Sequence, residues 1–506
     1  MSNIYHSRHP DHPWDFVQFE IQWEDHTPYG SLISGRLQKT IITNLYPKTY
    51  AVLLQNRQNI LQGKLPKKLD SLYKIISTER STAAYKKITK EDRFLYPETR
   101  LVKPARIIAT STFNQATLHM PWSIDLQNKI KDSFKIGPAT LPKDLKEFFL
   151  LVQSAVKQYD YRRPLAYNNK NKGLPLFVGH GCVTWSDGNC RLWIDPFFRP
   201  KNQKYSKCFQ PLLPFDFPES KHFVLITHSH RDHFDPASLL YFPNDTIFIV
   251  PQILKESVLS INIAFRLNQL GFQNVEKIAW WKKKYIGSFT ITALPFFGEQ
   301  PVSFMDQNPL EITNHGNTYF VQHKSLGKTL LLADSGSDPR QHVLHFARKL
   351  RKKLSNITFL FSNHRKWDLY PPIYLLSSVP QYLLFVKQEE LKVSQRIMFN
   401  PEELARFAEI IGAQYIIPYA MGGAKWFSDI KLGVDYLAPQ KLQQSSESHP
   451  KDLECFYNQG AEFSLTPTWQ PITLIPGQWI NKKGKTTFVE GFSIPQKSPT
   501  KHHAQS

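Results

Sequence analysis

The chain has 506 residues, and its 63 Lys and Arg against 42 Asp and Glu give a formal net charge of +21. Hydrophobic residues at 41% and charged residues at 21% are typical of a globular protein and exclude wholesale disorder, collagen and coiled coil. The longest apolar run, 374–386, is interrupted by proline and polar residues, so no membrane-spanning helix is expected. With no apolar signal core and only four cysteines, the sequence predicts a cytoplasmic protein without a disulfide framework.

The first third of the chain, residues 1–170, mixes short strand-like and helical stretches. Within it, residues 143–159 carry apolar side chains at helical spacing and predict an amphipathic helix. A polar, turn-rich break follows at 168–173. We therefore expect a separate N-terminal mixed α/β domain, whose role the sequence does not indicate.

Residues 171–440 have a different sequence pattern, in which short apolar runs end in polar turns. Helix-like segments such as 252–270 and 401–411 separate these runs. The pattern predicts buried strands with helices packed outside them, which is a layered α/β domain. Residues 441–496 are expected to form a C-terminal extension packed on that domain, and 497–506 a disordered tail.

Three imidazoles and one carboxylate follow the strand-like run 223–227 directly, in the segment His228-Ser229-His230-Arg231-Asp232-His233. A loop at the carboxyl end of a strand is the usual place for a site in an α/β sheet. Neutral His nitrogens and Asp oxygens are good ligands for zinc, iron or manganese. The spacing lets His228 and His230 turn toward one ion while Asp232 and His233 reach a neighbouring ion. A His-rich surface loop is the alternative.

This H-x-H-x-D-H arrangement resembles the metallo-β-lactamase superfamily. The segment Val178-Gly179-His180-Gly181 with LWIDP at 192–196, and LLLADSG at 330–336, carry the resemblance further. It implies an αββα sandwich after the N-terminal domain and two divalent metal ions, Zn²⁺ or Fe, with Mn²⁺ also open. It implies as ligands His228, His230, Asp232, His233 and Asp334, the last between the two ions. His180 and Asp195 are expected to support the site from behind the ligands.

The sequence departs from the superfamily pattern at two places. Where a third His is expected, the strand-like run 289–294 leads to Glu299, which we expect to be a ligand, with His315 and His323 as alternatives. Where the last His is expected, the chain has Tyr419, a candidate for a supporting or substrate contact. His364 is then the candidate for the missing ligand, with a simple loop imidazole as the alternative.

A hydrolase is the first functional hypothesis, because two adjacent ions would generate a hydroxide that attacks an ester, lactone or phosphodiester. Asp232 and Asp334 would orient the hydroxide, and Asp232 would accept its proton. The resemblance is nearest to the non-lactamase branch of phospholipase D-like and lactonase-like enzymes. The alternative is a non-haem diiron oxygenase, since Glu299 makes the site richer in oxygen ligands. The segment Gly298-Glu299 and the domain order resemble the diiron β-hydroxylases, which implies hydroxylation of a carrier-bound amino acid or related metabolite. A metal-dependent nuclease is a weaker alternative.

The positive charge gathers in two clusters, Lys282-Lys283-Lys284 and the segment 348–353. Such clusters are solvated faces or contact an anionic partner. We expect a small-molecule or carrier-bound substrate and an acidic partner protein in preference to nucleic acid. A homodimer stays open at this point, as do the substrate and the identity of the metal.

Overall fold

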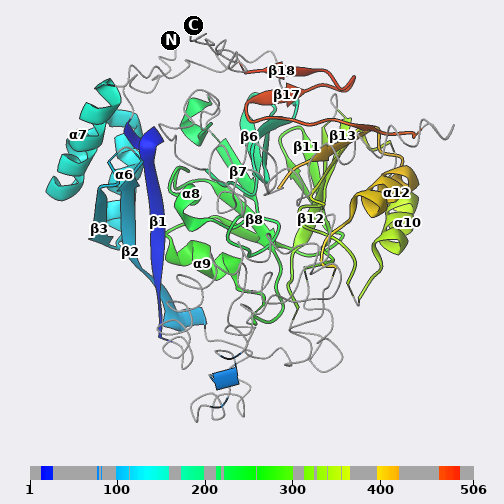
Figure 1. The fold of residues 1–506 in the computed structure, drawn as a ribbon, viewed down its shortest axis with the longest axis horizontal. Coiled ribbons are helices and arrows are strands. Elements are labelled where there is room, and N and C mark those ends of the chain that lie inside the picture. Colours follow the sequence, from blue (N-terminus) through cyan, green and yellow to red (C-terminus); the bar gives the residue numbers. More distant parts are fainter. Residues whose placement is uncertain are drawn as a thin grey trace, which may run out of the picture.

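The computed structural model shows two large β-sheets packed face to face, with helices on their outer surfaces (Figure 1). The strands form from the apolar runs of the sequence and the helices from the amphipathic segments between them, as the sequence pattern predicts. The structure describes residues 13–26, 74, 77–78, 81, 99–112, 114–158, 173–198, 212–217, 221–257, 259–299, 313–323, 327–338, 340–354, 356–364, 396–420 and 467–489.

The first large sheet has, within the described ranges, the strand order β18-β17-β4-β5-β6-β7-β8-β9. Its strands are β4 (Leu176–Gly179), β5 (Cys182–Ser186), β6 (Cys190–Ile194), β7 (Lys221–Leu225), β8 (Ile247–Pro251), β9 (Val275–Ile278), β17 (Gln478–Ile480) and β18 (Thr486–Phe488). The neighbours from β6 to β9 are parallel, and those from β18 to β6 are antiparallel. The parallel half places the carboxyl ends of β6, β7 and β8 at one edge.

The second large sheet has the order β10-β11-β12-β13-β14-β15-β16 among the described residues. Its strands are β10 (Lys283–Ile286), β11 (Phe289–Pro295), β12 (Asn317–His323), β13 (Gly327–Leu331), β14 (Phe359–Ser362), β15 (Tyr415–Pro418) and β16 (Gln470–Pro471). Strands β10 to β13 pair antiparallel, and β13 to β16 pair parallel. Here too the parallel strands direct their carboxyl ends toward one edge.

Apolar side chains from both sheets fill the space between them. Trp185, Ile194 and Leu225 of the first sheet share a fully or almost fully buried cluster with Ile291 and Phe361 of the second. Because both faces of each strand are covered, the central strands are buried along their whole length, as their continuous apolar runs predict. This core fixes the position of one sheet relative to the other, and so the relative position of the two sheet edges that carry the site.

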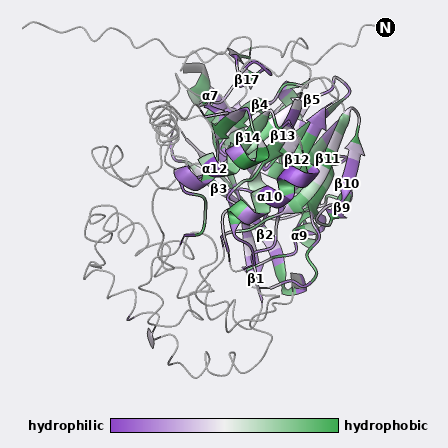
Figure 2. Ribbon diagram, turned by 90° about the vertical axis from the view of Figure 1, so that its right-hand side faces the viewer, coloured by the Kyte–Doolittle hydropathy of each residue, from purple (hydrophilic) through white to green (hydrophobic). Residues whose placement is uncertain are grey.

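Helices cover the outside of both sheets. The first sheet is covered by α8 (Pro236–Leu239) and α9 (Ile263–Gln269), and the second by α10 (Val343–Lys353) and α12 (Pro401–Ile411). In α12 the capping box of Asn400 and Glu403 begins the helix, and left-handed Gly412 ends it. Figure 2 shows α10 and α12 lying on the sheet beside β13 and β14. The described core is therefore the four-layered αββα arrangement predicted for 171–440.

Within the described ranges, the N-terminal part adds an antiparallel sheet with the order β1-β2-β3 and, after it, the helices α6 and α7. The elements are β1 (Val17–Asp25), β2 (Val102–Ser111), β3 (Thr117–Pro121), α6 (Ile124–Ile136) and α7 (Lys143–Gln158), so the amphipathic helix predicted at 143–159 is present. Its aromatic side chains join the cluster that covers the first large sheet; for example, Phe134 stacks on Tyr241 at 4.9 Å. One continuous core thus joins the two parts, and a separate N-terminal domain is not confirmed.

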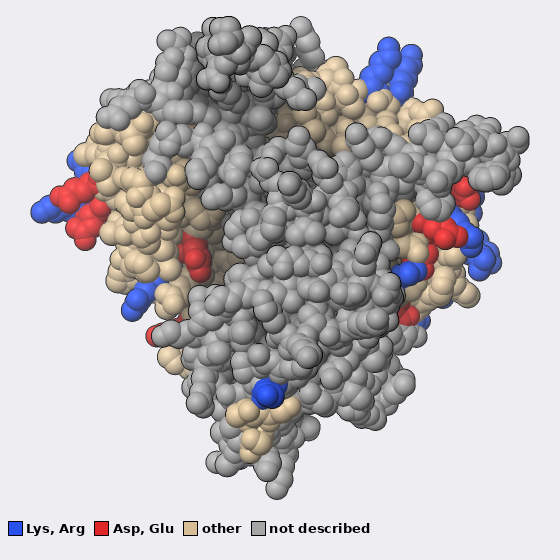
Figure 3. Space-filling view, in the orientation of Figure 1, with Lys and Arg blue, Asp and Glu red and all other residues tan. Residues whose placement is uncertain are grey.

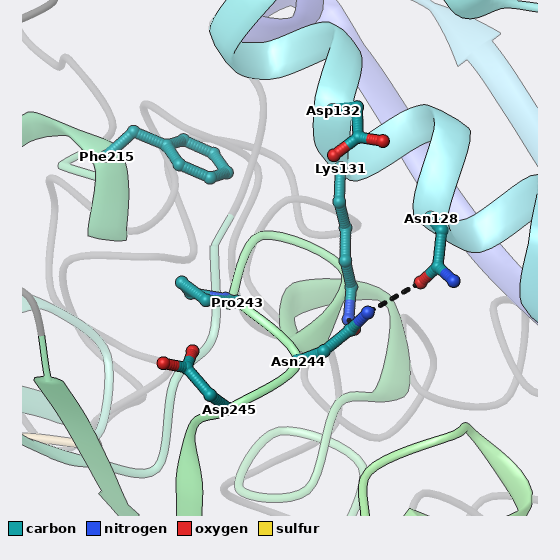
Figure 4. Close-up of a pocket in the computed structure, with 7 residues that line it drawn as sticks. All are labelled: Asn128, Lys131, Asp132, Phe215, Pro243, Asn244 and Asp245. Atoms are coloured by element: carbon teal, nitrogen blue, oxygen red, sulfur yellow. Dashed lines mark hydrogen bonds between the residues drawn. The ribbon is translucent and has the colours of Figure 1, made fainter.

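A polar junction also joins α6 to the loop after α8, around a cavity of about 300 Å³ (Figure 4). Lys131 Nζ donates to Asn244 Oδ1 at 2.5 Å and lies 4.1 Å from the centre of the Phe272 ring. Burial lowers the pKa of Lys131 to about 7, against a smaller opposing effect of Asp132. The cavity is lined by Asn128, Lys131, Asp132, Phe215, Pro243, Asn244 and Asp245.

The C-terminal segment contributes strands to both large sheets, since β16 pairs with β15 and β17 pairs with β4. The extension predicted at 441–496 stays a prediction, since 441–466 and 490–496 lie outside the described residues. The tail predicted at 497–506 and the boundary predicted at 168–173 also fall largely outside them. No helix in the described ranges has the length and hydropathy needed to cross a bilayer.

Candidate metal centre

The predicted ligands lie where strands of the two large sheets end. His228 follows β7, Glu299 follows β11 and Asp334 follows β13, so three chain segments more than 30 residues apart converge on one point. Because the two sheets pack face to face, these strand ends meet at one side of the sandwich. The structure thus gathers the imidazoles and carboxylates that the sequence only placed on separate loops.

The first ligand group consists of His228, His230, Glu299 and Asp334, all buried. Glu299 Oε2 lies 2.7 Å from His230 Nδ1 and 3.1 Å from His228 Nε2. Asp334 Oδ2 lies 4.0 Å from His228 Nε2. Two donors bound to one ion at about 2.1 Å are roughly 3.0–3.4 Å apart at angles between a right angle and tetrahedral. The pair His228 Nε2 and Glu299 Oε2 lies in that range, and ligand atoms of all four residues lie within 4.8 Å of one another, close enough to surround one ion.

The second group consists of His180, Asp232 and His233. His180 Nε2 lies 2.9 Å from Asp232 Oδ2, and Asp232 Oδ2 lies 4.0 Å from His233 Nε2. His233 Nε2 also lies 3.1 Å from Asp334 Oδ2. Asp334 therefore stands between the two groups, the position that the resemblance implied for a bridging carboxylate. The cluster as a whole is arranged for two metal ions.

Hydrogen bonds behind the ligands fix which ring nitrogens face the cluster. Asp195 Oδ2 accepts from Thr227 Oγ1 at 2.5 Å and from His233 Nδ1 at 2.7 Å. Since the Thr227 hydroxyl donates its proton to Asp195, it accepts from His228 Nδ1 at 2.9 Å. Both rings thus carry a proton on Nδ1 and turn Nε2 toward the carboxylates. This is the carboxylate-to-histidine support that orients metal-binding imidazoles.

Burial lowers the pKa of both His228 and His233, and the neighbouring charged groups then make the two pKa values differ. For His228, burial and the neighbouring His233 and His230 lower the pKa well below its usual value. For His233, burial also lowers the pKa, but the carboxylates of Asp334, Asp232 and Asp195 outweigh it and raise the pKa well above the usual value. The His228 ring is therefore neutral, with an unprotonated Nε2.

The His228 Nε2 atom provides the test of whether an ion fits. It is buried, has no hydrogen-bond partner in the described part of the chain, and faces Glu299 Oε2 at 3.1 Å. A lone pair and a carboxylate oxygen at this distance are both acceptors, so a shared cation is the group that satisfies both. His228, His230, Glu299 and Asp334 would hold one ion, and Asp232, His233, His180 and Asp334 the other. The residues present fit a dinuclear centre.

Several residues in the loops that bring the ligands together have strained, positive φ angles. Of the eight non-glycine residues with positive φ in the described ranges, five are His180, Asp195, Glu299, Ala333 and Ala420. His180, Asp195 and Glu299 belong to or support the cluster, Ala333 precedes Asp334, and Ala420 N donates to His180 O at 3.0 Å. Left-handed conformations cost about 1–3 kcal/mol each and persist where the surroundings enforce them. The strain turns each chain sharply after its strand so that the side chains meet.

A close backbone contact sets the position of Glu299. Gly336 N donates to Phe297 O at 2.8 Å, and Glu299 N donates to Ile397 O at 2.8 Å. A Cβ atom added at Gly298, whose φ is +97°, would lie 2.5 Å from Gly336 N. Only glycine fits this approach. The loop that carries Glu299 is thereby pressed against the loop that carries Asp334.

Some of the residues singled out in the sequence lie elsewhere. His364 is buried but belongs to neither ligand group, so its role as the last ligand stays a prediction. The Tyr419 hydroxyl accepts from Ala333 N at 2.9 Å and so supports the turn before Asp334. His315 stacks on Trp280 and His323 packs against Phe289, away from both groups. His180, expected behind the ligands, instead lies in the second group.

Three neutral residues beside the cluster were missed in the sequence. Thr227 holds the His228 tautomer, Asn363 Nδ2 donates to Asp334 Oδ1 at 2.6 Å, and Asn314 Nδ2 lies 3.4 Å from Glu299 Oε2. Asn363 directly follows a buried strand, and this position was the signal that could have identified it. Asn314 lies between elements, where no periodic pattern marks it.

Comparisons with known proteins point to one protein in particular. A scan against protein-family models finds no match. The chain is 30% identical over 138 residues to 4-amino-L-phenylalanyl-[CmlP-peptidyl-carrier-protein] 3-hydroxylase of Streptomyces venezuelae, a match that covers 27% of this chain and 26% of that protein. The aligned region therefore spans about a quarter of the curated relative.

Solved structures extend the likeness over nearly the whole chain. The crystal structure of CmlA, a diiron β-hydroxylase from Streptomyces venezuelae, matches with a TM-score of 0.54 and 14% identity over 90% of this chain and 97% of that chain. A variant of CmlA matches with a TM-score of 0.55 and 13% identity over 91% and 97%. The chain thus has the fold of CmlA, and its two large sheets have the αββα arrangement that the resemblance to the metallo-β-lactamase superfamily implied.

Proposed function

We propose that this chain is a non-haem diiron oxygenase that hydroxylates an amino acid, or a related metabolite, bound to a carrier protein. The observation that carries the proposal is the place of Glu299, whose Oε2 lies 2.7 Å from His230 Nδ1 and 3.1 Å from His228 Nε2. A carboxylate in the position of an imidazole makes the first group two His and two carboxylates. That ligand set suits iron better than zinc.

The comparisons support the same reading. The curated relative is named as a hydroxylase of an aminophenylalanyl group on a peptidyl carrier protein, and the solved structure with this fold is named as a diiron β-hydroxylase. The reaction would convert a substrate C–H group, O₂, two electrons and two protons into an alcohol and water. An external reductant would supply the electrons. Two bound iron ions would provide the reductive activation of O₂.

The residues of the chain would prepare this chemistry by orientation and by exclusion of water. Phe296 stacks on His228 with ring centres 4.8 Å apart and covers that side of the ligand group. The side chain of Asp232 is 44% exposed, whereas those of Glu299 and Asp334 are 3% and 5% exposed. Asp232 is therefore the most exposed of these three carboxylates. Burial raises its pKa, but the neighbouring His233 and His180 outweigh this and lower the pKa well below its usual value, which keeps the carboxylate ionised.

A hydrolase remains the second candidate, because one observation favours it. Asp334 stands between two ligand groups, and two adjacent ions are the arrangement that hydrolases use to generate hydroxide. With zinc or manganese in place of iron, Asp232 would orient the attacking water toward an ester, lactone or phosphodiester. The identity of the bound metal separates the two candidates.

Metal analysis of the full-length protein, purified without added metal, tests the proposal. We expect about two equivalents of iron and visible ligand-to-metal absorption bands in the oxidised protein. The reduced protein should consume O₂ and add one oxygen atom to an aminoacyl group on a carrier domain. Glu299→His is the matched variant, and it should shift the preference toward zinc. Zinc or manganese in the wild type, with turnover of an ester or phosphodiester, would instead establish the hydrolase.

A further inference from the structure

Two basic segments that lie more than 60 residues apart in the sequence form one surface. Lys353, at the end of α10, places its Nζ atom 4.1 Å from the centre of the Trp281 ring, just before β10. Trp281 is 37% exposed and Tyr285 is 71% exposed. We call this region the basic surface; it comprises Trp281, Lys282, Lys283, Tyr285, Arg348, Lys349, Arg351, Lys352 and Lys353, all exposed.

Contacts within the folded chain account for only some of the basic side chains on this surface. Arg351 Nη1 donates to Ile411 O at the end of α12, and Lys284 beside the surface pairs with Glu276 at 2.5 Å. Basic residues in the last turn of α10 also complement the helix dipole. Within the described ranges, none of the seven Lys and Arg side chains of the surface forms an ion pair with a carboxylate. The surface therefore carries more positive charge than the fold requires.

Stacked and packed rings connect the basic surface with the metal centre. Trp280, next to Trp281, lies 5.0 Å from His315 and 5.9 Å from Phe297, measured between ring centres. Phe297 packs on Phe346 of α10, and its neighbour Phe296 stacks on His228. Trp281, at one end of the basic surface, therefore adjoins the ring layer that packs against the first ligand group. A partner bound at this end would lie beside that layer.

The charges around the basic surface favour a compact partner. Helix α12 packs beside α10 and exposes Glu402 and Glu409. Acidic and basic side chains both appear at the right-hand edge of Figure 3, where Figure 1 places these two helices. A nucleic acid with a continuous phosphate backbone would be repelled by the acidic helix, whereas a small acidic domain could cover the cations alone. Exposed Trp, Tyr and Arg are also residues enriched at protein interfaces.

We infer that the basic surface formed by α10 and the segment 281–285 is the docking site for an acidic protein domain that carries the substrate to the metal centre. The inference rests on the proposed function for the role of the partner as a carrier, and on the charge and placement of the surface for the docking itself. The contacts would be electrostatic, with Trp281 and Tyr285 as the apolar anchors.

Binding of an acidic pantetheinylated peptidyl-carrier domain to the full chain tests this inference, with a fluorescent label on the carrier and anisotropy as the signal. Two paired variants reverse the charges, Lys282→Glu with Lys283→Glu, and Arg348→Glu with Lys352→Glu. Each pair should weaken binding about tenfold or more at low salt, and the difference should shrink as salt rises. The matched control is Lys482→Glu with Lys483→Glu, an exposed lysine pair in the turn between β17 and β18.

Other outcomes would overturn the inference. Absence of carrier binding, or equal weakening by the control pair, would mean that no docking site lies here. Tighter binding of a single-stranded DNA oligonucleotide, lost in the same variants, would assign the surface to nucleic acid. The proposed function is tested separately: carrier binding without hydroxylation would leave docking standing and the oxygenase wrong. Hydroxylation of the carrier-bound amino acid at an equal rate in all variants would leave the oxygenase standing and the docking site wrong.

Discussion

Asp195 Oδ2 accepts hydrogen bonds from both Thr227 Oγ1 and His233 Nδ1, at 2.5 and 2.7 Å. One carboxylate oxygen therefore orients a ligand ring directly and a second ring, His228, through the Thr227 hydroxyl. The carboxylate is fully buried and Asp195 has a φ of +41°, so the fold holds it at some energetic cost. Its position behind two imidazoles makes it a positioning residue.

Asp195→Asn should weaken metal binding while leaving the fold intact. An amide preserves the shape but replaces one acceptor oxygen with a donor. An NH₂ group in the place of Oδ2 would lose the bonds from both Thr227 Oγ1 and His233 Nδ1, and in the place of Oδ1 it would face the Thr227 N–H that donates there at 2.7 Å. Loss of such a supporting partner typically costs 10- to 100-fold in metal affinity, and we expect about that range here. Competition with a chelator measures the affinity, and circular dichroism the fold. Asp245→Asn, at an exposed loop position, is the control; equal affinities in both variants would contradict the assignment.

Thr227→Val should have a similar but smaller effect, because it removes the acceptor for His228 Nδ1 and keeps the side-chain volume. The His228 ring would then be free to adopt the other tautomer, and metal affinity should fall about tenfold. Thr227→Ser restores the hydroxyl and should restore the affinity. If the serine variant were as weak as the valine variant, packing and not the hydrogen bond would be the role of Thr227.

Much of the site could be predicted from the sequence because its ligands follow buried strands. His228, His230, Asp232 and His233 form one local motif, and Asp334 ends a run of leucines, so both places were identifiable from residue order. His180 was identified but placed behind the ligands, because one histidine after a short strand does not reveal the direction of its side chain. That direction depends on a left-handed backbone at His180, with a φ of +49°.

The contacts that hold these loops together could not be predicted. The approach of Gly298 to Gly336 depends on how the two loops pack against residues 397–398, far away in the sequence. The shared core of β1, α6 and the first large sheet was missed for the same reason, since apolar periodicity indicates a buried face and not the partner that buries it. Pairing partners are a property of the fold as a whole.

Gly298→Ala should destabilise the protein and displace Glu299. The added methyl group would lie 2.5 Å from Gly336 N and 2.6 Å from Ile397 O, in a backbone with a φ of +97°. Since neither neighbour is a flexible side chain, we expect a loss of about 2–4 kcal/mol in the free energy of unfolding. The measurement is chemical denaturation, followed by iron content of the folded fraction.

Gly137→Ala is the matched control for that variant. Gly137 also has a positive φ, +79°, but no atom lies within 4 Å of an added Cβ. Its cost should be limited to that of its backbone conformation, with φ +79° and ψ −164°, about 1–3 kcal/mol, with no change in iron content. Equal losses for the two variants would show that the loop around Gly298 can move aside, and that the close contact does not fix Glu299.

Lys131→Met should change how stability depends on pH. Burial lowers the pKa of Lys131 from 10.5 to about 7 in the folded chain, so between these values the unfolded chain holds a proton that the folded chain releases. Raising the pH through this window therefore favours the folded state, by at most about 1.4 kcal/mol per pH unit. Below pH 7 both states are protonated, and the folded state bears the whole desolvation cost.

The methionine variant keeps most of the packing against Phe272 but cannot titrate, so its stability should lack this contribution. The free energy of unfolding of the wild type minus that of the variant should rise steadily from pH 7 toward pH 10 and stay level from pH 5 to pH 6.5. Lys146→Met, on the exposed side of α7, controls for the loss of a surface charge. If the difference in the free energy of unfolding stays constant from pH 7 to 10, the Lys131 ammonium is hydrated through the cavity shown in Figure 4. The junction between α6 and the loop after α8 would then be more open to water than in this structure.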